Sequence, residues 1–402
     1  MQDHEFIDSP QALAKYLDYT RKARRFDFDT EFISEGKYRT ELCLIQVATE
    51  FGLVLLDPQG IGDLTPFWER ICQPEVTVTA HSARSEMEFC YRAIGRIPEN
   101  LFDIQLAAAF VGSDYPSSLK RLAEEYMNVA LPKDETRTDW RARPLSSKQE
   151  QYALDDVRYL HGITLKIFRK LETLGRTPWF LEETRGYLAR MLQSFTTDKW
   201  QKISGISSLG RRELAIVVEL SKWRENSASQ KGRVPKYILR DDIIVELAKR
   251  KSSDPARIAD LRSLCKRNNL HVLTEELSAV IENALTLPEA DLPCTATTNS
   301  YPSYQIASAF LLSFIHNEAK RGNIAPCLIA TPRDARDFVA YKAGTLPEGI
   351  TPRLATGWRK EFLGSVPNDL LDGKAYIRFD MNNLGAPLCP EKAPGFMKEI
   401  RY

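Results

Sequence analysis

Apolar and polar positions in the first part of the chain alternate between the two-residue period of strands and the longer period of helices. Apolar runs of strand length lie at residues 25–32, 41–49, 52–57, 76–80 and 101–104. The first three follow one another with short links, which predicts an antiparallel meander. Helical patterns lie at residues 64–71, 82–94, 105–111, 118–127 and 146–171. This mixture predicts an α/β sheet with helices packed on it.

The rest of the chain has a helical pattern with little sign of a sheet. Apolar positions recur at helical spacing from residue 205 to about residue 287, and Pro288 and Pro293 then mark a linker. A third part holds two further helical patterns, at 304–321 and 332–341, and a strand-like run at 375–379. We therefore expect three domains, at residues 1–198, 203–292 and 298–402.

The net charge of +1 hides an uneven distribution of charge along the chain. Residues 1–198 hold 25 Lys and Arg against 31 Asp and Glu, a net charge of −6. Residues 199–267 hold 17 Lys and Arg against 8 Asp and Glu, a net charge of +9. An acidic first part with a basic middle suggests that one domain performs the chemistry and another binds a polyanion. A basic helical surface that only contacts solvent is the alternative.

The composition excludes several classes of protein. Hydrophobic residues make up 43% of the 402 residues and charged residues 27%, as in ordinary globular proteins. The seven cysteines are scattered and form no C-x-x-C pair, so neither a disulfide framework nor a zinc ribbon is indicated. The N-terminus carries no apolar signal region, and the longest apolar stretch, 306–315, is too short to span a bilayer. We expect a cytoplasmic monomer without membrane contact.

Acidic residues occupy alternate positions of the first predicted strand. Because residues two apart in a strand point the same way, Asp27, Asp29 and Glu31 share one face. A buried acidic face is costly unless a cation neutralises it, and carboxylate oxygens are the ligands that Mg²⁺ and Mn²⁺ prefer. The pattern indicates a metal site, and a solvated edge strand with its polar residues outward is the alternative.

Further acidic residues lie in two of the predicted helices. Glu86 and Glu88 stand at the start of the helix that follows the fourth predicted strand. Tyr152 and Asp156 are four residues apart, so they project from one face of the long predicted helix. Asp155 is rotated away from that face.

These segments together resemble the ribonuclease D family, in the DEDD superfamily of 3′→5′ exonucleases. The family's Asp-Thr-Glu-Phe motif stands here at residues 29–32, and its Tyr-x-x-x-Asp motif runs from Tyr152 to Asp156, as in the tyrosine subclass. Residues 102–107 and 137–156 also follow the family pattern. The resemblance covers about residues 5–175 and implies a ribonuclease H-like, mixed five-stranded sheet flanked by helices.

The resemblance also implies an activity. It is that of a 3′→5′ exoribonuclease that trims structured RNA such as tRNA precursors and releases nucleoside 5′-monophosphates, using two divalent cations, Mg²⁺ or Mn²⁺. The residues that it assigns to catalysis are Asp29, Glu31, Glu86, Tyr152 and Asp156. The four acids would bind the metal ions, and Tyr152 would orient the attacking water. The candidate substrate contacts are Phe32, Arg137, Trp140 and Arg143, with a core position as the alternative for Trp140.

One position departs from the family pattern. The second motif of the family normally presents an aspartate, and the matching residue here is Glu86. Glutamate keeps the charge but is one methylene group longer, and Mg²⁺ requires near-ideal geometry. We expect Glu86 to bind the metal ion directly. Coordination through a water molecule, a substitute role for Glu88, reduced activity and a changed metal preference are the alternatives.

The helical part at about 205–290 resembles the helicase-and-RNase-D C-terminal (HRDC) domain, through Leu214, Leu220, Trp223, Arg224 and the closing residues 284–288. The charge of +9 there favours nucleic acid as its partner. The third part has a faint likeness to a second module of this kind. Two rival functions remain open. One is a DNA exonuclease of the same superfamily, and the other is a catalytically decayed RNA-binding protein.

Overall fold

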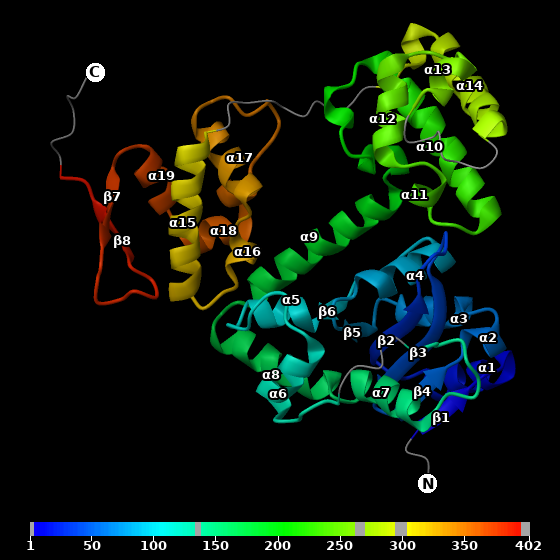
Figure 1. Ribbon diagram of the computed structural model, residues 1–402. Helices are drawn as coiled ribbons and strands as arrows, with labels where there is room; N and C mark the ends of the chain where they lie inside the picture. Colours follow the sequence, from blue (N-terminus) through cyan, green and yellow to red (C-terminus); the bar gives the residue numbers. More distant parts are fainter. Residues whose placement is uncertain (1–3, 133–137, 262–269, 294–303, 395–402) are drawn as a thin grey trace. The chain divides into compact units, whose positions relative to one another are not determined.

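The computed structural model describes residues 4–132, 138–261, 270–293 and 304–394 (Figure 1). They divide into two compact units. The first unit takes the described residues within 1–31, 42–195 and 301–402, and the second takes those within 32–41 and 196–300. Most of the predicted first domain, without residues 32–41 and 196–198, thus lies in one unit with the predicted third domain. The three predicted boundaries stay a prediction. No helix among the described residues is both long enough and apolar enough to cross a membrane.

A six-stranded mixed sheet organises the first unit, in the order β1-β4-β3-β2-β5-β6. The strands are β1 (His4–Ile7), β2 (Arg25–Ile33), β3 (Glu41–Thr49), β4 (Gly52–Leu56), β5 (Thr77–Ala80) and β6 (Leu101–Asp103). β3 and β4 pair antiparallel as predicted, whereas β1–β4, β2–β5 and β5–β6 pair parallel. The prediction of an α/β fold is confirmed, but the prediction of five strands is wrong. The extra strand, β1, is four residues long and buries only Ile7, so its apolar pattern is too weak to detect.

Helices cover the sheet and supply the core around it. They are α1 (Pro10–Tyr19), α2 (Pro58–Ile61), α3 (Thr65–Ile71), α4 (Arg84–Ile94), α5 (Ile104–Ala109), α6 (Leu119–Met127), α7 (Ser147–Arg158), α8 (Leu160–Thr173) and α9 (Thr177–Thr196). Phe28 of β2 packs edge-on against Phe67 and Trp68 of α3. The single helix predicted at 146–171 is two helices, divided at Tyr159, which is the C-cap of α7 and the N-cap of α8.

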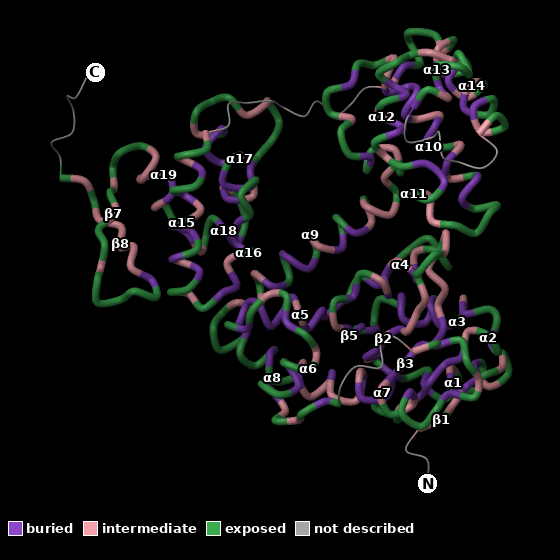
Figure 2. Tube along the Cα trace, viewed as in Figure 1, coloured by how far each residue is buried: buried purple, intermediate pink, exposed green. Residues whose placement is uncertain are grey.

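The C-terminal part belongs to the same unit and shares its hydrophobic core. Its elements are α15 (Gln305–Arg321), α16 (Pro326–Ile329), α17 (Pro332–Lys342), α18 (Gly357–Leu363), α19 (Val366–Leu371), β7 (Ala375–Phe379) and β8 (Leu388–Lys392). One cluster of buried residues joins Phe110 and Ile163 to Phe314 and Trp358. Figure 2 shows buried positions along α5, α15 and α17. The strand predicted at 375–379 is β7, which pairs antiparallel with β8.

The described residues within 196–300, which make up most of the second unit, are mainly helical. This unit holds α10 (Arg211–Lys231), α11 (Pro235–Ile238), α12 (Asp241–Arg250), α13 (Pro255–Ala259) and α14 (Leu270–Thr286). Apolar residues of α10, α12 and α14 form its core, among them Leu214, Leu247 and Ile281. The buried Arg224 is paired with Asp241, with a nitrogen–oxygen distance of 2.7 Å.

Candidate active site

The predicted acids come from three elements of the first unit. In β2, the aromatic residues point toward α3, which leaves Asp29 and Glu31 on the opposite side of the strand. Glu86 comes from the first turn of α4, directly after the end of β5. Asp156 comes from α7. The parallel pairing of β2 with β5 brings the ends of both strands to the same edge of the sheet.

The position of Glu86 is held by local hydrogen bonds. The side chain is buried, and the Thr30 hydroxyl donates to its Oε1 at 2.7 Å. The loop before α4 is fixed by Asp103, whose carboxylate accepts from the backbone N–H groups of Ser82 and Ala83 at 3.1 and 3.0 Å. Asp103 is therefore a buried structural acid. Glu88 instead pairs with Arg92 at 2.5 Å and is partly exposed, which does not favour it as a substitute for Glu86.

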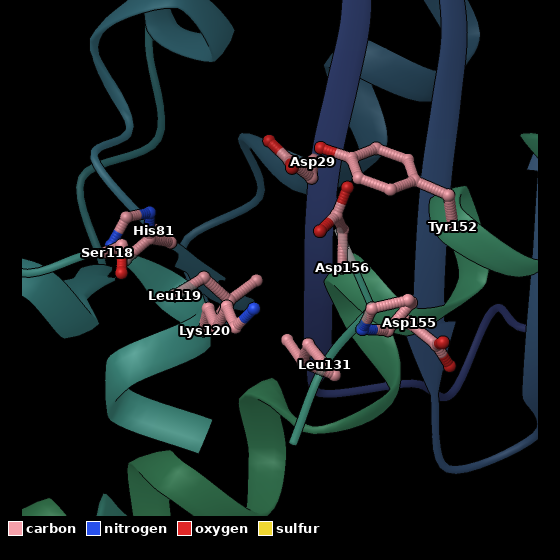
Figure 3. A pocket seen from close by; sticks show the side chains of 10 residues that line it. Asp29, His81, Ser118, Leu119, Lys120, Leu131, Tyr152, Asp155 and Asp156 are labelled. Carbon is pink, nitrogen blue, oxygen red and sulfur yellow. The ribbon is translucent and has the colours of Figure 1, made fainter. Parts of the chain in front are cut away.

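The start of α7 sets the direction of Tyr152 and Asp156. Ser146 caps the helix, and Gln149 completes a reciprocal capping box with it. Tyr152 and Asp156 both point toward Asp29, whereas Asp155 points away from it (Figure 3). Asp155 accepts a hydrogen bond from Gln151 at 2.8 Å. The spacing of four residues thus places the two predicted side chains on one face of the helix.

The four acids influence one another electrostatically. Burial raises the pKa of Asp29 well above its usual range, and the neighbouring charges of Glu86, Asp156 and Glu31 raise it further. Burial, followed by the charges of Asp156 and Glu86, raises the pKa of Glu31 to about 8. Burial also raises the pKa of Glu86 to about 7, against the hydrogen bond from Thr30. Each of these three acids therefore resists ionisation in the absence of a nearby positive charge.

A cavity of about 210 Å³ opens beside these residues. Asp29, Tyr152 and Asp156 line one side of it, and residues at the start of α6 line the other (Figure 3). The lining residues that the sequence did not indicate include Ser118, Leu119, Lys120 and Leu131. The only sequence signal there is Ser118 as the N-cap of α6, and it carries no information about which element the helix faces.

Two neighbouring polar residues have structural partners. The Nε2 atom of His81 lies 2.7 Å from the carbonyl oxygen of Ser117, which indicates a structural role for this histidine. Asp27 shares the strand face with Asp29 but is fully buried and forms an ion pair with Arg25 at 3.0 Å. The opposing charge of Arg25 limits the effect of burial, which raises the pKa of Asp27 to about 6.

The predicted substrate contacts lie in different environments. Trp140 is 1% exposed, so its ring is not accessible to a nucleobase, and the core alternative fits better. The guanidinium of Arg143 forms two hydrogen bonds with Asp57, at 2.9 and 2.7 Å, and is not a free phosphate ligand. Phe32 is half-buried in β2. Arg137 lies outside the described residues.

The donor set suits a divalent cation in charge and in chemistry. Asp29, Glu31, Glu86 and Asp156 present only carboxylate oxygens, and the mutual repulsion between them is what a bound cation removes. Within the described part of the chain, however, no three Asp, Glu, His or Cys side chains stand ready to hold one ion together.

Comparison with known proteins assigns the chain that carries this site to a family. Residues 4–172 match the 3′-5′ exonuclease family, and residues 213–269 match the HRDC domain. Ribonuclease D of Escherichia coli is 30% identical over 372 residues, which cover 92% of this chain and 98% of the relative. The chain belongs to the ribonuclease D family. Ribonuclease D of Bartonella henselae is 34% identical over 376 residues, covering 90% of this chain and 88% of the relative.

A solved structure supports the same assignment. The crystal structure of Escherichia coli RNase D, described as an exoribonuclease involved in structured RNA processing, matches with a TM-score of 0.78 at 29% identity. The match covers 92% of this chain and 99% of that structure. The predictions of a ribonuclease D-type 3′→5′ exoribonuclease and of an appended HRDC domain are confirmed. Exonucleases of this family depend on divalent metal ions.

Proposed function

We propose that this ribonuclease D family member trims the 3′ ends of structured RNA, such as tRNA precursors, in the cytoplasm. The products would be nucleoside 5′-monophosphates, released one at a time. The observation that supports this most directly is the cluster of four interacting acids beside a cavity that Asp29, Asp156 and Tyr152 line, in a chain of this family. The cavity is large enough for part of one nucleotide, which suits removal of a terminal residue.

The four acids are the proposed ligands of two divalent cations, Mg²⁺ or Mn²⁺. Asp29, Glu31 and Asp156 would hold the ion on the side of the attacking water, and Asp29 with Glu86 would hold the ion on the side of the leaving group. Such ions, when bound, lower the pKa of the attacking water and stabilise the charge that develops on the phosphate oxygens. The raised pKa values of Asp29, Glu31 and Glu86 are consistent with this role, because a cation favours their ionised forms.

Tyr152 is proposed to orient the attacking water through its hydroxyl group. A phenol with an ordinary pKa of about 10 is a poor base at pH 7, so positioning is the role that its chemistry allows. Its ring projects from α7 toward Asp29 (Figure 3). Leu119 and Leu131 offer apolar surface across the cavity for the sugar or base of the terminal nucleotide.

RNA is the proposed partner of the basic helical segment as well. Residues 199–267 carry a net charge of +9, with 17 Lys and Arg against 8 Asp and Glu, in the region that matches the HRDC domain. Phosphate contacts from such a surface would hold a folded RNA while its 3′ end enters the site. We propose that the protein acts as a monomer.

The experiment uses RNA and DNA oligonucleotides labelled at the 3′ or 5′ end, incubated with the full chain and Mg²⁺ or Mn²⁺. We expect stepwise shortening of 5′-labelled RNA and immediate release of a labelled mononucleotide from 3′-labelled RNA. Asp29→Asn and Asp156→Asn should lower the rate by about a thousandfold or more while RNA binding persists. Glu88→Gln, which removes an acid paired with Arg92, is the control.

Three results would change the proposal. Preferential shortening of DNA would favour the DNA exonuclease. RNA binding without shortening in either metal would favour a decayed site. Wild-type rates in Asp29→Asn would exclude the proposed metal site.

A further inference from the structure

Residues 138–146, the segment before α7, contact Tyr152, the proposed water-orienting residue. The rings of Trp140 and Tyr152 lie with their centroids 5.9 Å apart and their planes at 43°. Trp140 is 1% exposed, and Tyr152 is half-buried at the cavity. The indole therefore limits the positions that the phenol ring can take, without itself facing the solvent.

The position of Trp140 is in turn fixed by Arg143. The guanidinium of Arg143 donates to both carboxylate oxygens of Asp57, to the carbonyl oxygen of Cys43 at 2.8 Å and to that of Trp140 at 2.8 Å. Asp57 directly follows β4 and caps α2, and Cys43 lies in β3. Arg143 thus connects the backbone at Trp140 to β3 and to the C-terminal end of β4. The planar guanidinium makes all of these bonds at once, which a lysine cannot do.

A second connection runs from the same segment to α7. The Nε2 atom of Gln149 donates to the Thr138 hydroxyl at 3.2 Å, while its Oε1 accepts from the backbone N–H of Ser146 at 3.0 Å. Gln149 is buried. The segment and the helix that carries Tyr152 are therefore joined on both sides of Trp140.

We propose that Trp140 and Arg143 are positioning residues for the exonuclease reaction. Trp140 holds the Tyr152 ring so that its hydroxyl group faces the carboxylates, and Arg143 holds Trp140 on the sheet. Both residues act on the rate of the chemical step and contribute little to RNA binding. This inference rests on the proposed function, since it assigns a support to the proposed water-orienting residue.

A role in RNA contact would instead require that the side chains of these two residues be accessible to RNA. A base could reach Trp140 only after the ring left the core, and a phosphate could bind Arg143 only in competition with Asp57. Removal of an RNA contact would raise KM and weaken the salt dependence of binding. Removal of a support lowers kcat instead, because a displacement of about 1 Å in a reacting group can cost about 100-fold in rate.

The experiment measures kcat, KM and the salt dependence of binding for Trp140→Phe and Arg143→Lys. Trp140→Phe removes no hydrogen bond, because the indole N–H has no hydrogen-bond partner among the described residues. We expect kcat to fall about 10- to 100-fold with KM and the salt slope unchanged. Arg141→Lys is the matched control, since Arg141 lies between the two, is exposed and pairs with Asp139. It should leave kcat unchanged.

A raised KM with an unchanged kcat in Trp140→Phe would overturn the proposal in favour of an RNA contact, and wild-type values of both would overturn it altogether. Thermal melting identifies a variant that fails to fold. If Arg143→Lys fails to fold, the kinetics of Trp140→Phe alone test the proposal. Failure of the proposed function itself is separate, because it would appear as an inactive wild type.

A double-mutant cycle provides the second readout. If Trp140 acts through Tyr152, then Trp140→Phe should cause no further loss of kcat in a Tyr152→Phe background. Losses that multiply would show that Trp140 acts independently of Tyr152 and would overturn the proposal. If Tyr152→Phe turns over too slowly for the cycle, the division of effects between kcat and KM decides by itself.

Discussion

Glu86 stands where the resemblance to the family implies an aspartate, and its surroundings define what such a change would mean. The carboxylate is buried at the start of α4 and accepts a hydrogen bond from Thr30 at 2.7 Å. The longer side chain therefore has a defined direction instead of sampling solvent. Its raised pKa, to about 7, reflects burial more than any neighbouring charge. A buried acid with this environment fits a metal ligand better than a surface residue.

Substitutions of Glu86 test this interpretation. We expect Glu86→Gln to lower kcat by about a hundredfold or more, because it keeps the size and removes the charge that would hold a metal ion. Glu86→Asp should retain activity, and its ratio of Mn²⁺ to Mg²⁺ rates should be smaller than that of the wild type, since Mg²⁺ tolerates misplaced ligands less. Initial rates on a labelled RNA in each metal provide the measurement. Equal rates for the wild type and Glu86→Gln would exclude Glu86 as a ligand, and Glu88→Gln is the control.

Residues of the site were predictable from sequence where a short-range period carried the information. Strand alternation placed Asp29 and Glu31 on one face, and four-residue spacing placed Tyr152 with Asp156. Lys120 and the other residues of α6 that line the cavity were not predictable, because the direction of a helix across a cavity depends on tertiary packing. The burial of Trp140 has the same origin.

At the scale of elements, the N-terminus of α7 is the part of the fold on which the site most depends. The Ser146 hydroxyl accepts from the backbone N–H of Gln149 at 3.3 Å, and the Oε1 atom of Gln149 accepts from the backbone N–H of Ser146. These contacts satisfy N–H groups that a helix start leaves unpaired. They also fix the axial position of the helix, and therefore that of Tyr152 and Asp156.

The cap gives a prediction about stability. Ser146→Ala should lower the free energy of unfolding by about 1 kcal/mol, because it removes the side-chain cap. Ser147→Ala is the matched control, since Ser147 is exposed at the first helical position and alanine is favourable there. Urea unfolding followed by circular dichroism compares the two variants. If both unfold like the wild type, the cap does not stabilise α7 measurably.

Sequence patterns located most elements but missed two features of their organisation. The apolar pattern at 146–171 continues through Tyr159, because the boundary between α7 and α8 does not alter the period of the apolar residues. Strand β1 is stabilised by its parallel pairing with β4, a contact between residues about 50 positions apart that no local pattern records. Both are consequences of packing between elements.

At the scale of the whole molecule, the C-terminal part is joined to the exonuclease part by a buried polar and aromatic junction. Trp358 stacks on Trp179 with ring centroids 6.0 Å apart, and its indole N–H donates to Glu183 at 3.1 Å. Glu183 also pairs with Arg359 at 2.7 Å. Arg176 donates to the carbonyl oxygens of Phe110 and Asn323, on either side of the junction.

This junction predicts that the C-terminal part stabilises the nuclease. Trp358→Ala should lower the free energy of unfolding by about 3–5 kcal/mol, because a large buried ring is removed and Glu183 loses a donor. Tyr341→Ala, at a residue that is 48% exposed in α17, should change it by less than about 0.5 kcal/mol. Thermal melting and residual exonuclease activity after heating measure both. Equal melting temperatures would mean that the junction contributes nothing to the stability of the nuclease.

The division of the chain followed from sequence only in part. The middle part was identifiable as helical and basic from its period and charge, and as HRDC-like through its resemblance to that domain. The third part offered no sign that its apolar residues pack against Phe110 and Phe180. Amphipathic helices show that a face is buried and do not show which surface covers it. Long-range core packing such as that of Phe110 against Trp358, at 5.0 Å between ring centroids, lies beyond any local pattern.

The basic helical segment gives the last prediction, which concerns how RNA is held. Lys231, Arg233 and Lys249 are exposed in the second unit. If they bind phosphates, changing all three to glutamine should weaken RNA binding and reduce the slope of log K against log salt by about 1 for each phosphate that is no longer neutralised. Changing Lys320, Arg336 and Lys360, which are exposed in the C-terminal part, to glutamine is the control for net charge, because it also removes three positive charges. Filter binding of a structured RNA from low to high salt measures the slopes. Identical slopes for the wild type and the triple variant would mean that these three side chains meet only solvent, because counterion release depends on phosphates neutralised and not on overall charge.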